Sequence, residues 1–201
     1  MFSSEKIAEL RLKIQGYMTP KRYAHTLEVA KMAVEIGEAL IPEMVCELEC
    51  AALLHDIAKD MPKDDLISCS ELSSEDFETP AVLHSLLAPE VIKRDFAEFA
   101  TENILSAVRK HTTGDDGMSV FDEIIFLSDY IEKSRTYISC VETRNFFFEK
   151  FLNGHTMDEK LLALHRAVYK SLENTVSSLK LRNEKIHYKT ILTLNYISSI
   201  I

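Results

Sequence analysis

The sequence has few of the residues that interrupt regular structure. Only 5 glycines and 5 prolines occur among 201 residues, and tryptophan is absent. Long stretches instead repeat apolar residues at the 3.6-residue spacing of an amphipathic helix, which favours helices joined by short loops. No apolar run approaches the ~20 residues that a membrane-spanning helix needs, so we expect no membrane partner.

Cysteine is also scarce, with 4 in the chain and no Cys-x-x-Cys pair among them. Cys46 and Cys50 would share a helix face, but two thiols alone make a poor metal site. Residues 1–10 are polar and charged, without the apolar core of a signal peptide. These features disfavour a disulfide framework and favour free thiols in a reducing, cytoplasmic environment.

Acidic residues outnumber basic ones by 32 to 23, which gives a formal net charge of -9. Nucleic-acid backbones and anionic membranes carry the same sign, and the chain shows no basic stripe, so we expect no nucleic-acid partner. A phosphorylated small molecule is still a suitable partner if metal ions or a few Lys and Arg side chains mask its charge locally.

The periodicity predicts an all-α protein. We expect one domain over residues 1–201, because no linker, repeat or low-complexity tract divides the chain. Thr19 and Pro20 mark a helix start, as N-cap and first-turn residues, with a helix to about residue 40. Residues 68–79 are expected to form a polar connector, and the conformation of residues 186–201 is left open. Further helices are expected over residues 44–58, 80–96, 102–110, 120–133, 141–152 and 157–181.

The strongest local signal is the pair His55-Asp56, which directly follows an apolar helical run. Burying an unpaired carboxylate costs several kcal/mol, so a buried Asp56 must be paired, hydrogen-bonded or bound to a metal ion. Adjacent helical residues differ by ~100° in direction, so both side chains can lean toward one ion beside the helix. The alternative is that these residues only form a helix C-terminus. His55 and Lys59 would then lie near the negative end of the helix dipole, and Asp56 would be exposed.

Four further residues strengthen the metal hypothesis. His25, His84 and His111 each stand on or at the end of an expected helix, and Asp129 lies inside an apolar one. Each alone is more often structural, but their coincidence with His55-Asp56 favours a shared site. Imidazole and carboxylate without thiolate suit iron, manganese or zinc, and a central Asp can bridge two ions ~3.5–4 Å apart. Ligands spread over several helices are typical of a site inside a helical bundle.

The ordered set of these six residues resembles the HD-domain superfamily of metal-dependent phosphohydrolases. The longer strings are most similar to its YqeK branch, which resembles symmetrically cleaving diadenosine tetraphosphate hydrolases. The similarity extends from about Thr19 into the tail. The matching strings are Arg22-x-x-His25-Thr26, His55-Asp56-Ile57-Ala58-Lys59, Arg109-x-His111-Thr112-Thr113-Gly114, Gly117-Met118-Ser119, and Asp129-Tyr130-Ile131-Glu132 followed by Arg135.

The resemblance implies a helical bundle with a di-metal centre, iron first, with manganese or zinc as alternatives. His25, His55, Asp56 and Asp129 would bind one ion, and Asp56, His84 and His111 the other, so that Asp56 bridges them. A hydroxide between the ions would attack a phosphorus in the middle of the tetraphosphate and release two ADP. Asp56 and Lys59 would be the catalytic residues.

The resemblance also implies contacts with a nucleotide substrate. Lys59, one turn beyond His55, would reach the phosphates, and Arg135 would bind them as a fork; without the resemblance, both would be read as surface charges. Thr112 and Thr113 would bind phosphate or ribose. Residues 183–201 resemble a segment that covers the nucleotide, and Thr190 and Asn195 match its pattern. The ligands His25, His84, His111 and Asp129 would line the same pocket.

Several residues depart from the family pattern without removing a ligand. Ser85-Leu86-Leu87 is bulkier than usual, Asp115-Asp116 places negative charge near an anionic substrate, and Lys133 and Tyr188 replace usual prolines. His155 and His165 are expected to be surface or packing residues, and His187 matches no metal position.

Three functions therefore stay open at the level of sequence. The first is symmetrical hydrolysis of diadenosine tetraphosphate, and the second is an HD-type nucleotidase or triphosphohydrolase acting on mononucleotides. The third, a non-catalytic nucleotide-binding regulatory module, is disfavoured because all six ligands and Lys59 are retained. The partner is a small-molecule nucleotide in each case, and a homodimer is allowed.

Overall fold

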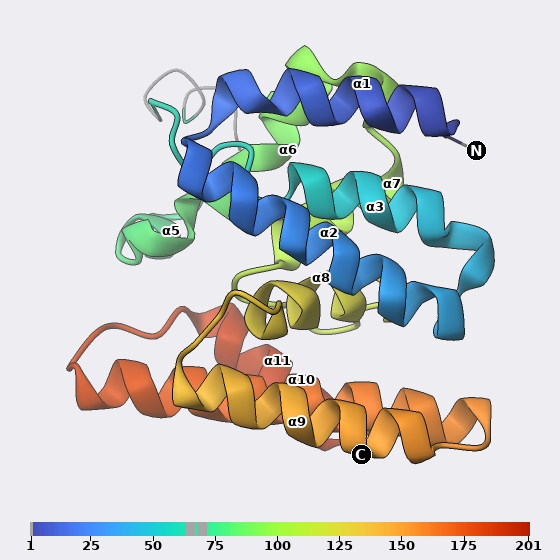
Figure 1. Cartoon of the computed structure of the whole chain (residues 1–201). Helices are drawn as coiled ribbons and strands as arrows, with labels where there is room; N and C mark the ends of the chain where they lie inside the picture. The colour runs from blue at the N-terminus through green and yellow to red at the C-terminus, as the bar shows by residue number, and fades with distance from the viewer. Residues whose placement is uncertain (1, 63–66, 68–71) are drawn as a thin grey trace.

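The computed structural model describes residues 2–62, 67 and 72–201, and every regular element in these ranges is a helix (Figure 1). The all-α prediction is therefore confirmed. Short 3-10 turns lie at residues 15–17, 42–44, 80–82 and 97–99. The α-helices are α1 (Ser4–Ile14), α2 (Pro20–Leu40), α3 (Val45–Leu54), α5 (Ser74–Phe77), α6 (Leu83–Asp95), α7 (Glu102–Lys110), α8 (Val120–Ile131), α9 (Ile138–Asn153), α10 (Met157–Leu181) and α11 (Tyr188–Ser198).

Several helix boundaries follow from local sequence. The Thr19 side chain accepts a hydrogen bond from the Arg22 amide, 3.3 Å away, so α2 begins at Pro20 as expected. Helices α7 and α10 also match their predicted bounds, and α10 opens with a capping box between Thr156 and Glu159.

Two predicted helices are too long. The helix expected over residues 44–58 ends at Leu54, and residues 55–60 form successive tight turns. The helix expected over residues 120–133 ends at Ile131, because Glu132 leaves the helical conformation with ψ 155°. Both corrections fall beside candidate metal ligands.

Two helices were not predicted. Helix α1 carries many charged residues, but Ile7, Leu10 and Ile14 recur at helical spacing, are buried, and lie on the helix that packs against α3. The tail folds as α11, which buries Thr190, Thr193 and Ile197. The connector expected over residues 68–79 lies partly outside the described residues, and its described part contains α5.

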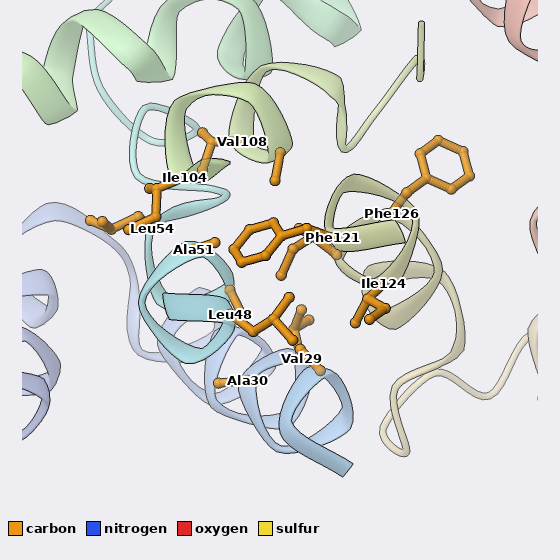
Figure 2. Close-up of a cluster of buried hydrophobic side chains, with 14 of the residues drawn as sticks. Val29, Ala30, Leu48, Ala51, Leu54, Ile104, Val108, Phe121, Ile124 and Phe126 are labelled. Atoms are coloured by element: carbon orange, nitrogen blue, oxygen red, sulfur yellow. The ribbon is translucent and has the colours of Figure 1, made fainter. Parts of the chain in front are cut away.

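Helix α8 lies at the centre of the helix packing. It contacts α2, α3, α7, α9 and α10, while α9 and α10 lie side by side as an antiparallel pair (Figure 1). Its side chains are apolar on nearly every side, as expected of an internal helix. Figure 2 shows Phe121 and Ile124 of α8 among Val29, Leu48 and Val108 from three other helices. Asp129 is therefore carried on an internal helix, and its side chain is half-buried, with 21% exposed.

The described residues also bear on two expectations from composition. Cys46, Cys50 and Cys140 are free thiols, and Cys69 lies outside the described residues. Within the described ranges, no helix combines the length and the apolar character that crossing a bilayer requires.

Helix α11 is fixed against the loop that follows His111. The Thr193 hydroxyl donates to the Thr113 carbonyl oxygen over 3.1 Å. Gly114 beside it has φ +67°, a left-handed conformation that favours glycine. A Cβ atom at Gly114 would lie 2.5 Å from Thr193 Oγ1, so the close approach of helix and loop needs a residue without a side chain.

Replacing Gly114 should therefore loosen this contact. Gly114→Ala is expected to cost roughly 1–3 kcal/mol of unfolding free energy beyond the backbone strain, because the added methyl group displaces Thr193. Gly117→Ala is the matched control, since Gly117 has φ +70° with nothing within 4 Å of the added Cβ. Urea denaturation measures both. Equal losses in the two variants would show that the contact with Thr193 contributes nothing.

Candidate metal centre

The six predicted ligands come from five separate parts of the chain and meet in one place. His25 is on α2, His84 is on the first turn of α6, and Asp129 is near the end of α8. His55 and Asp56 follow α3, and His111 follows α7. They form three overlapping groups that could each hold a metal ion, because the potential ligand atoms of each group all lie within 4.8 Å of one another. The groups are His25–His55–Asp56, His55–His111–Asp129 and Asp56–His84–His111.

Three of the histidines are oriented in the same way. The Nδ1 atoms of His55, His84 and His111 lie 2.6, 2.9 and 2.7 Å from the backbone carbonyl oxygens of Ala52, Ala81 and Val108, each three residues earlier. A carbonyl oxygen only accepts, so each Nδ1 carries the proton and donates it. The lone pair of each neutral imidazole is therefore on Nε2, which is the tautomer that metal binding requires.

Asp56 stands between the two halves of the cluster. Its Oδ1 lies 3.2 Å from Nε2 of His84 and 3.6 Å from Nε2 of His111. Its Oδ2 lies 3.6 Å from Nε2 of His55 and 2.6 Å from the guanidinium of Arg22. One carboxylate oxygen thus faces each half, which is the arrangement a bridging carboxylate needs.

The donor set fits divalent cations. Nε2 of His55 is buried and makes no hydrogen bond to any described residue. Nε2 of His84 lies 3.2 Å from Nε2 of His111, although their Nδ1 atoms hold the protons and leave neither Nε2 one to donate. Lone pairs that face one another and a carboxylate in a buried site favour a shared cation. The described cluster contains no thiolate, as expected for iron, manganese or zinc.

Burial keeps two of these histidines neutral. Desolvation lowers the pKa of His55 to about 4 and the pKa of His84 to about 4, against the favourable effect of Asp56. His25 differs, because burial lowers its pKa but the carboxylates of Asp129 and Glu132 outweigh burial and raise it. At neutral pH the cluster therefore offers imidazole lone pairs at His55 and His84.

Both carboxylates are held ionised by their neighbours. Burial opposes ionisation of Asp56, yet its pKa lies well below the ordinary value. The guanidinium of Arg22 donates to Oδ2 of Asp56 over 2.6 Å and stabilises the ionised carboxylate. Burial likewise opposes ionisation of Asp129, and Arg135 and His25 reverse the effect, so its pKa is also well below the usual range. The site is thus preset to bind cations without releasing a proton from either carboxylate.

The residues expected to bind substrate lie at different distances from this cluster. Lys59 Nζ is 3.1 Å from both ring nitrogens of His84, and the Thr112 hydroxyl is 3.2 Å from its Nε2. Arg135 donates from Nη2 to Oδ1 of Asp129 over 2.6 Å. Thr113 is buried in the loop after His111, Thr190 is buried in α11, and Asn195 is exposed on α11. A role of Thr190 and Asn195 in nucleotide binding stays a prediction.

Sequence reasoning missed two residues that the structure places beside the site, and a third that contacts the loop after His111. Arg22 bonds Asp56, Glu132 lies 3.2 Å from Nδ1 of His25, and Lys189 lies 2.6 Å from the carboxylate of Asp115. Arg22 and Glu132 both lie in the strings that match the family, and this match is the sequence signal that points to them. Lys189 offsets the negative charge of Asp115, which the sequence was expected to place near the substrate. Only the fold brings Lys189 and Asp115 together. Among the remaining histidines, His165 pairs with Glu123, as expected of a packing residue.

The lowered histidine pKa values predict a pH dependence of stability. An unfolded chain takes up protons on His55 and His84 near pH 6.5, whereas the folded metal-free protein does so only near pH 4. Stability of the metal-free protein should therefore fall as the pH drops from 6.5 toward 4, by on the order of 3 kcal/mol for each group.

Urea denaturation in the presence of a chelator, from pH 8 to pH 4, measures this slope. His84→Gln should make the slope shallower, whereas His155→Gln, at an exposed position, should leave it unchanged. A slope unaffected by His84→Gln would show that His84 does not resist protonation in the folded state.

Comparison with known proteins agrees with this geometry. The HD-domain family matches residues 22–134, which span the ligands from His25 to Asp129. The chain is 29% identical over 190 residues to a symmetrical bis(5'-nucleosyl)-tetraphosphatase of Bacillus subtilis, covering 92% of this chain and 94% of the relative. It is 27% identical over 180 residues to the protein of the same name from Staphylococcus aureus, covering 88% of this chain and 86% of the relative.

The fold is also known from a crystal structure. A protein of Clostridium acetobutylicum, described as a predicted HD superfamily hydrolase involved in NAD metabolism, superposes with a TM-score of 0.80 at 29% identity over all of both chains. The match of more than half the chain to the HD-domain family, together with these relatives, settles the assignment. The chain belongs to the HD-domain family, in the YqeK branch of its hydrolases.

Proposed function

We propose that the protein is a metal-dependent hydrolase that cleaves diadenosine tetraphosphate symmetrically into two ADP. The observation that carries the proposal is the buried convergence of imidazole Nε2 atoms and carboxylate oxygens around Asp56. The substrate is supported by relatives that align with about nine tenths of the chain. They bear the name symmetrical bis(5'-nucleosyl)-tetraphosphatase.

The resemblance to the family supplies the division of the ligands between two ions, and the three overlapping groups of side chains are compatible with it. We assign His25, His55, Asp56 and Asp129 to one ion and Asp56, His84 and His111 to the other, with iron as the expected metal. When bound, two divalent ions would supply Lewis-acid activation of water and neutralise developing charge on the phosphate. Arg22 would hold Oδ2 of Asp56 in place, since its guanidinium already bonds that oxygen at 2.6 Å.

The charge of the site suits a polyphosphate. The carboxylates of Asp56, Asp129 and Glu132 are balanced by Arg22, Lys59 and Arg135, which are all within 4 Å of a carboxylate or histidine of the site. Two divalent cations with a hydroxide between them would therefore leave an excess of about three positive charges. A bridge of four phosphates carries about one negative charge per phosphate, so this excess offsets most of the charge of the bridge.

Lys59, Arg135 and Thr112 would then position the substrate. Lys59 and Thr112 both approach His84, so their donors would meet phosphate oxygens on that side of the centre. Arg135 contacts Asp129, which in turn contacts His25, and would bind the neighbouring phosphates as a fork. Cations at these two places would hold the phosphate chain across the metals, which favours attack near its middle.

The tail would form the wall of the nucleotide pocket. His187 caps α11 and its Nε2 donates to Asp76 over 2.8 Å, while Lys189 bonds Asp115 in the loop after His111. These contacts tie α11 to α5 and to the loop that carries Thr112 and Thr113. We therefore propose that residues 1–201 act as one domain in which residues 183–201, including Thr190 and Asn195, border the nucleotide.

The products of hydrolysis test the substrate assignment. Protein purified without oxygen should contain close to two metal equivalents and convert diadenosine tetraphosphate into ADP as the sole nucleotide product. Chromatography of the products, with oxygen-18 water to label the attacked phosphate, makes the measurement. Asp56→Ala should lose both metal and turnover.

A mixture of AMP and ATP would contradict symmetrical cleavage, and rapid cleavage of a mononucleotide alone would indicate a nucleotidase. Two bound metals without turnover of any nucleotide would indicate a regulatory module.

Lys59 provides a separate test of phosphate binding. Lys59→Ala should lower kcat/KM for diadenosine tetraphosphate by about 10- to 100-fold, the loss expected of one charged hydrogen bond of ~1.5–3 kcal/mol, while two metals stay bound. Lys93→Ala is the control, because Lys93 is exposed on α6. Unchanged kinetics in Lys59→Ala would rule out a contact between this lysine and the phosphates.

A further inference from the structure

The four histidines of the centre are oriented by two different kinds of partner. His55, His84 and His111 each donate Nδ1–H to the carbonyl oxygen three residues earlier. For His55 and His111 this oxygen is in the last turn of α3 or α7, where the helix leaves carbonyl oxygens unused, and for His84 it is in the 3-10 turn before α6. His25 is in the interior of α2, where carbonyl oxygens already accept hydrogen bonds within the helix. Its ring therefore needs a partner from elsewhere in the fold.

Glu132 is that partner. Its Oε1 lies 3.2 Å from Nδ1 of His25, while Nε2 of the same ring lies 2.9 Å from Oδ1 of Asp129. Glu132 is 1% exposed, whereas the ring that it contacts faces the centre. The carboxylate accepts a hydrogen bond from Nδ1–H and leaves Nε2 directed at the site.

Hydrogen bonds from Ser134 and Arg144 hold Glu132 in position. Ser134 donates to its carboxylate from the backbone amide over 2.5 Å and from the hydroxyl over 2.7 Å. Arg144 of α9 donates to the Glu132 carbonyl oxygen over 2.7 Å and so holds the chain where α8 ends. A carboxylate buried this completely is costly unless such partners surround it. The end of α8 at Ile131, two residues earlier than the sequence predicts, allows this arrangement.

We propose that Glu132 is a positioning residue for one of the two metal ions. It selects the tautomer of His25 and increases the basicity of its Nε2, as carboxylates do for ligating histidines, and it acts on the ion bound by His25 and not on the one bound by His84 and His111. The inference rests on the metal centre of the proposed function, but it makes no use of the identity of the substrate.

Metal affinity measures this role without reference to catalysis. Cobalt(II) binding by the full chain, titrated against a competing chelator, should give two equivalents in the wild-type protein. Glu132→Gln keeps the shape but lacks the charge, and we expect it to weaken one equivalent by 10- to 100-fold and leave the other unchanged. Glu132→Ala should weaken the same equivalent further.

Glu123→Gln is a closely matched control. Glu123 is on α8, the helix that Glu132 directly follows, and it is also 1% exposed. Its carboxylate contacts Nδ1 of a histidine, His165, over 2.8 Å, but His165 is not part of the centre. Thermal unfolding of the metal-free variants compares the structural cost of the two substitutions. If Glu132 had a purely structural role, Glu132→Gln would weaken the binding of both cobalt ions, or Glu123→Gln would weaken cobalt binding as much as Glu132→Gln does.

Proton NMR of the cobalt protein adds a signature of His25 itself. Four strongly shifted, solvent-exchangeable signals are expected from the Nδ1–H groups of the four histidines, and only one should move in Glu132→Gln and disappear by exchange in Glu132→Ala. The proposal is overturned if Glu132→Gln binds both ions within twofold of wild type, if both ions weaken together, or if all four signals are unchanged.

The proposed substrate can fail independently of this result. If the wild-type protein binds two cobalt ions but does not cleave diadenosine tetraphosphate, the substrate assignment falls while the affinity comparison still decides the role of Glu132. If the wild-type protein binds no cobalt, the metal centre and the inference about Glu132 fall together.

Discussion

The structure depends on a cluster of buried carboxylates and imidazoles that cannot satisfy one another by hydrogen bonds alone. Asp56 and Asp129 are ionised in a site from which the surrounding helices exclude most water, and the imidazoles nearest to Asp56 direct lone pairs, not protons, into the same space. Such a site is costly without cations and stable with them. Metal binding and the energetics of the fold are therefore coupled.

Helix ends solve the problem of orientation. An imidazole at a helix end finds a carbonyl oxygen that the helix does not use, so His55 and His111 are set by the backbone with no second side chain. His25 lacks this option in the middle of α2 and uses Glu132 instead. The centre thus combines ligands that need only local structure with one that depends on how α2 packs against the end of α8.

The cations around the site balance its carboxylates one for one. Arg22 and Arg135 each bond a carboxylate of the cluster, and Lys59 lies against His84. Because this balance is reached without metal, the charge that two divalent ions would add is left for the substrate. The excess of acid over the whole chain, with a net charge of -9, does not oppose this, since the positive potential is local and partly buried.

Sequence patterns alone predict the helical class, the start of α2 at Thr19-Pro20, and the six residues that the fold brings together. Capping and periodicity are local properties, and His-Asp pairs among apolar residues are costly unless they share a ligand. The early ends of α3 and α8, the helix formed by the tail, and the partners of Asp56, His25 and Asp115 could be seen only in the folded chain. Those features arise from contacts between residues far apart in the chain, such as Arg22 with Asp56 and Glu132 with His25, and neither spacing nor composition records which distant side chain will supply the missing hydrogen bond.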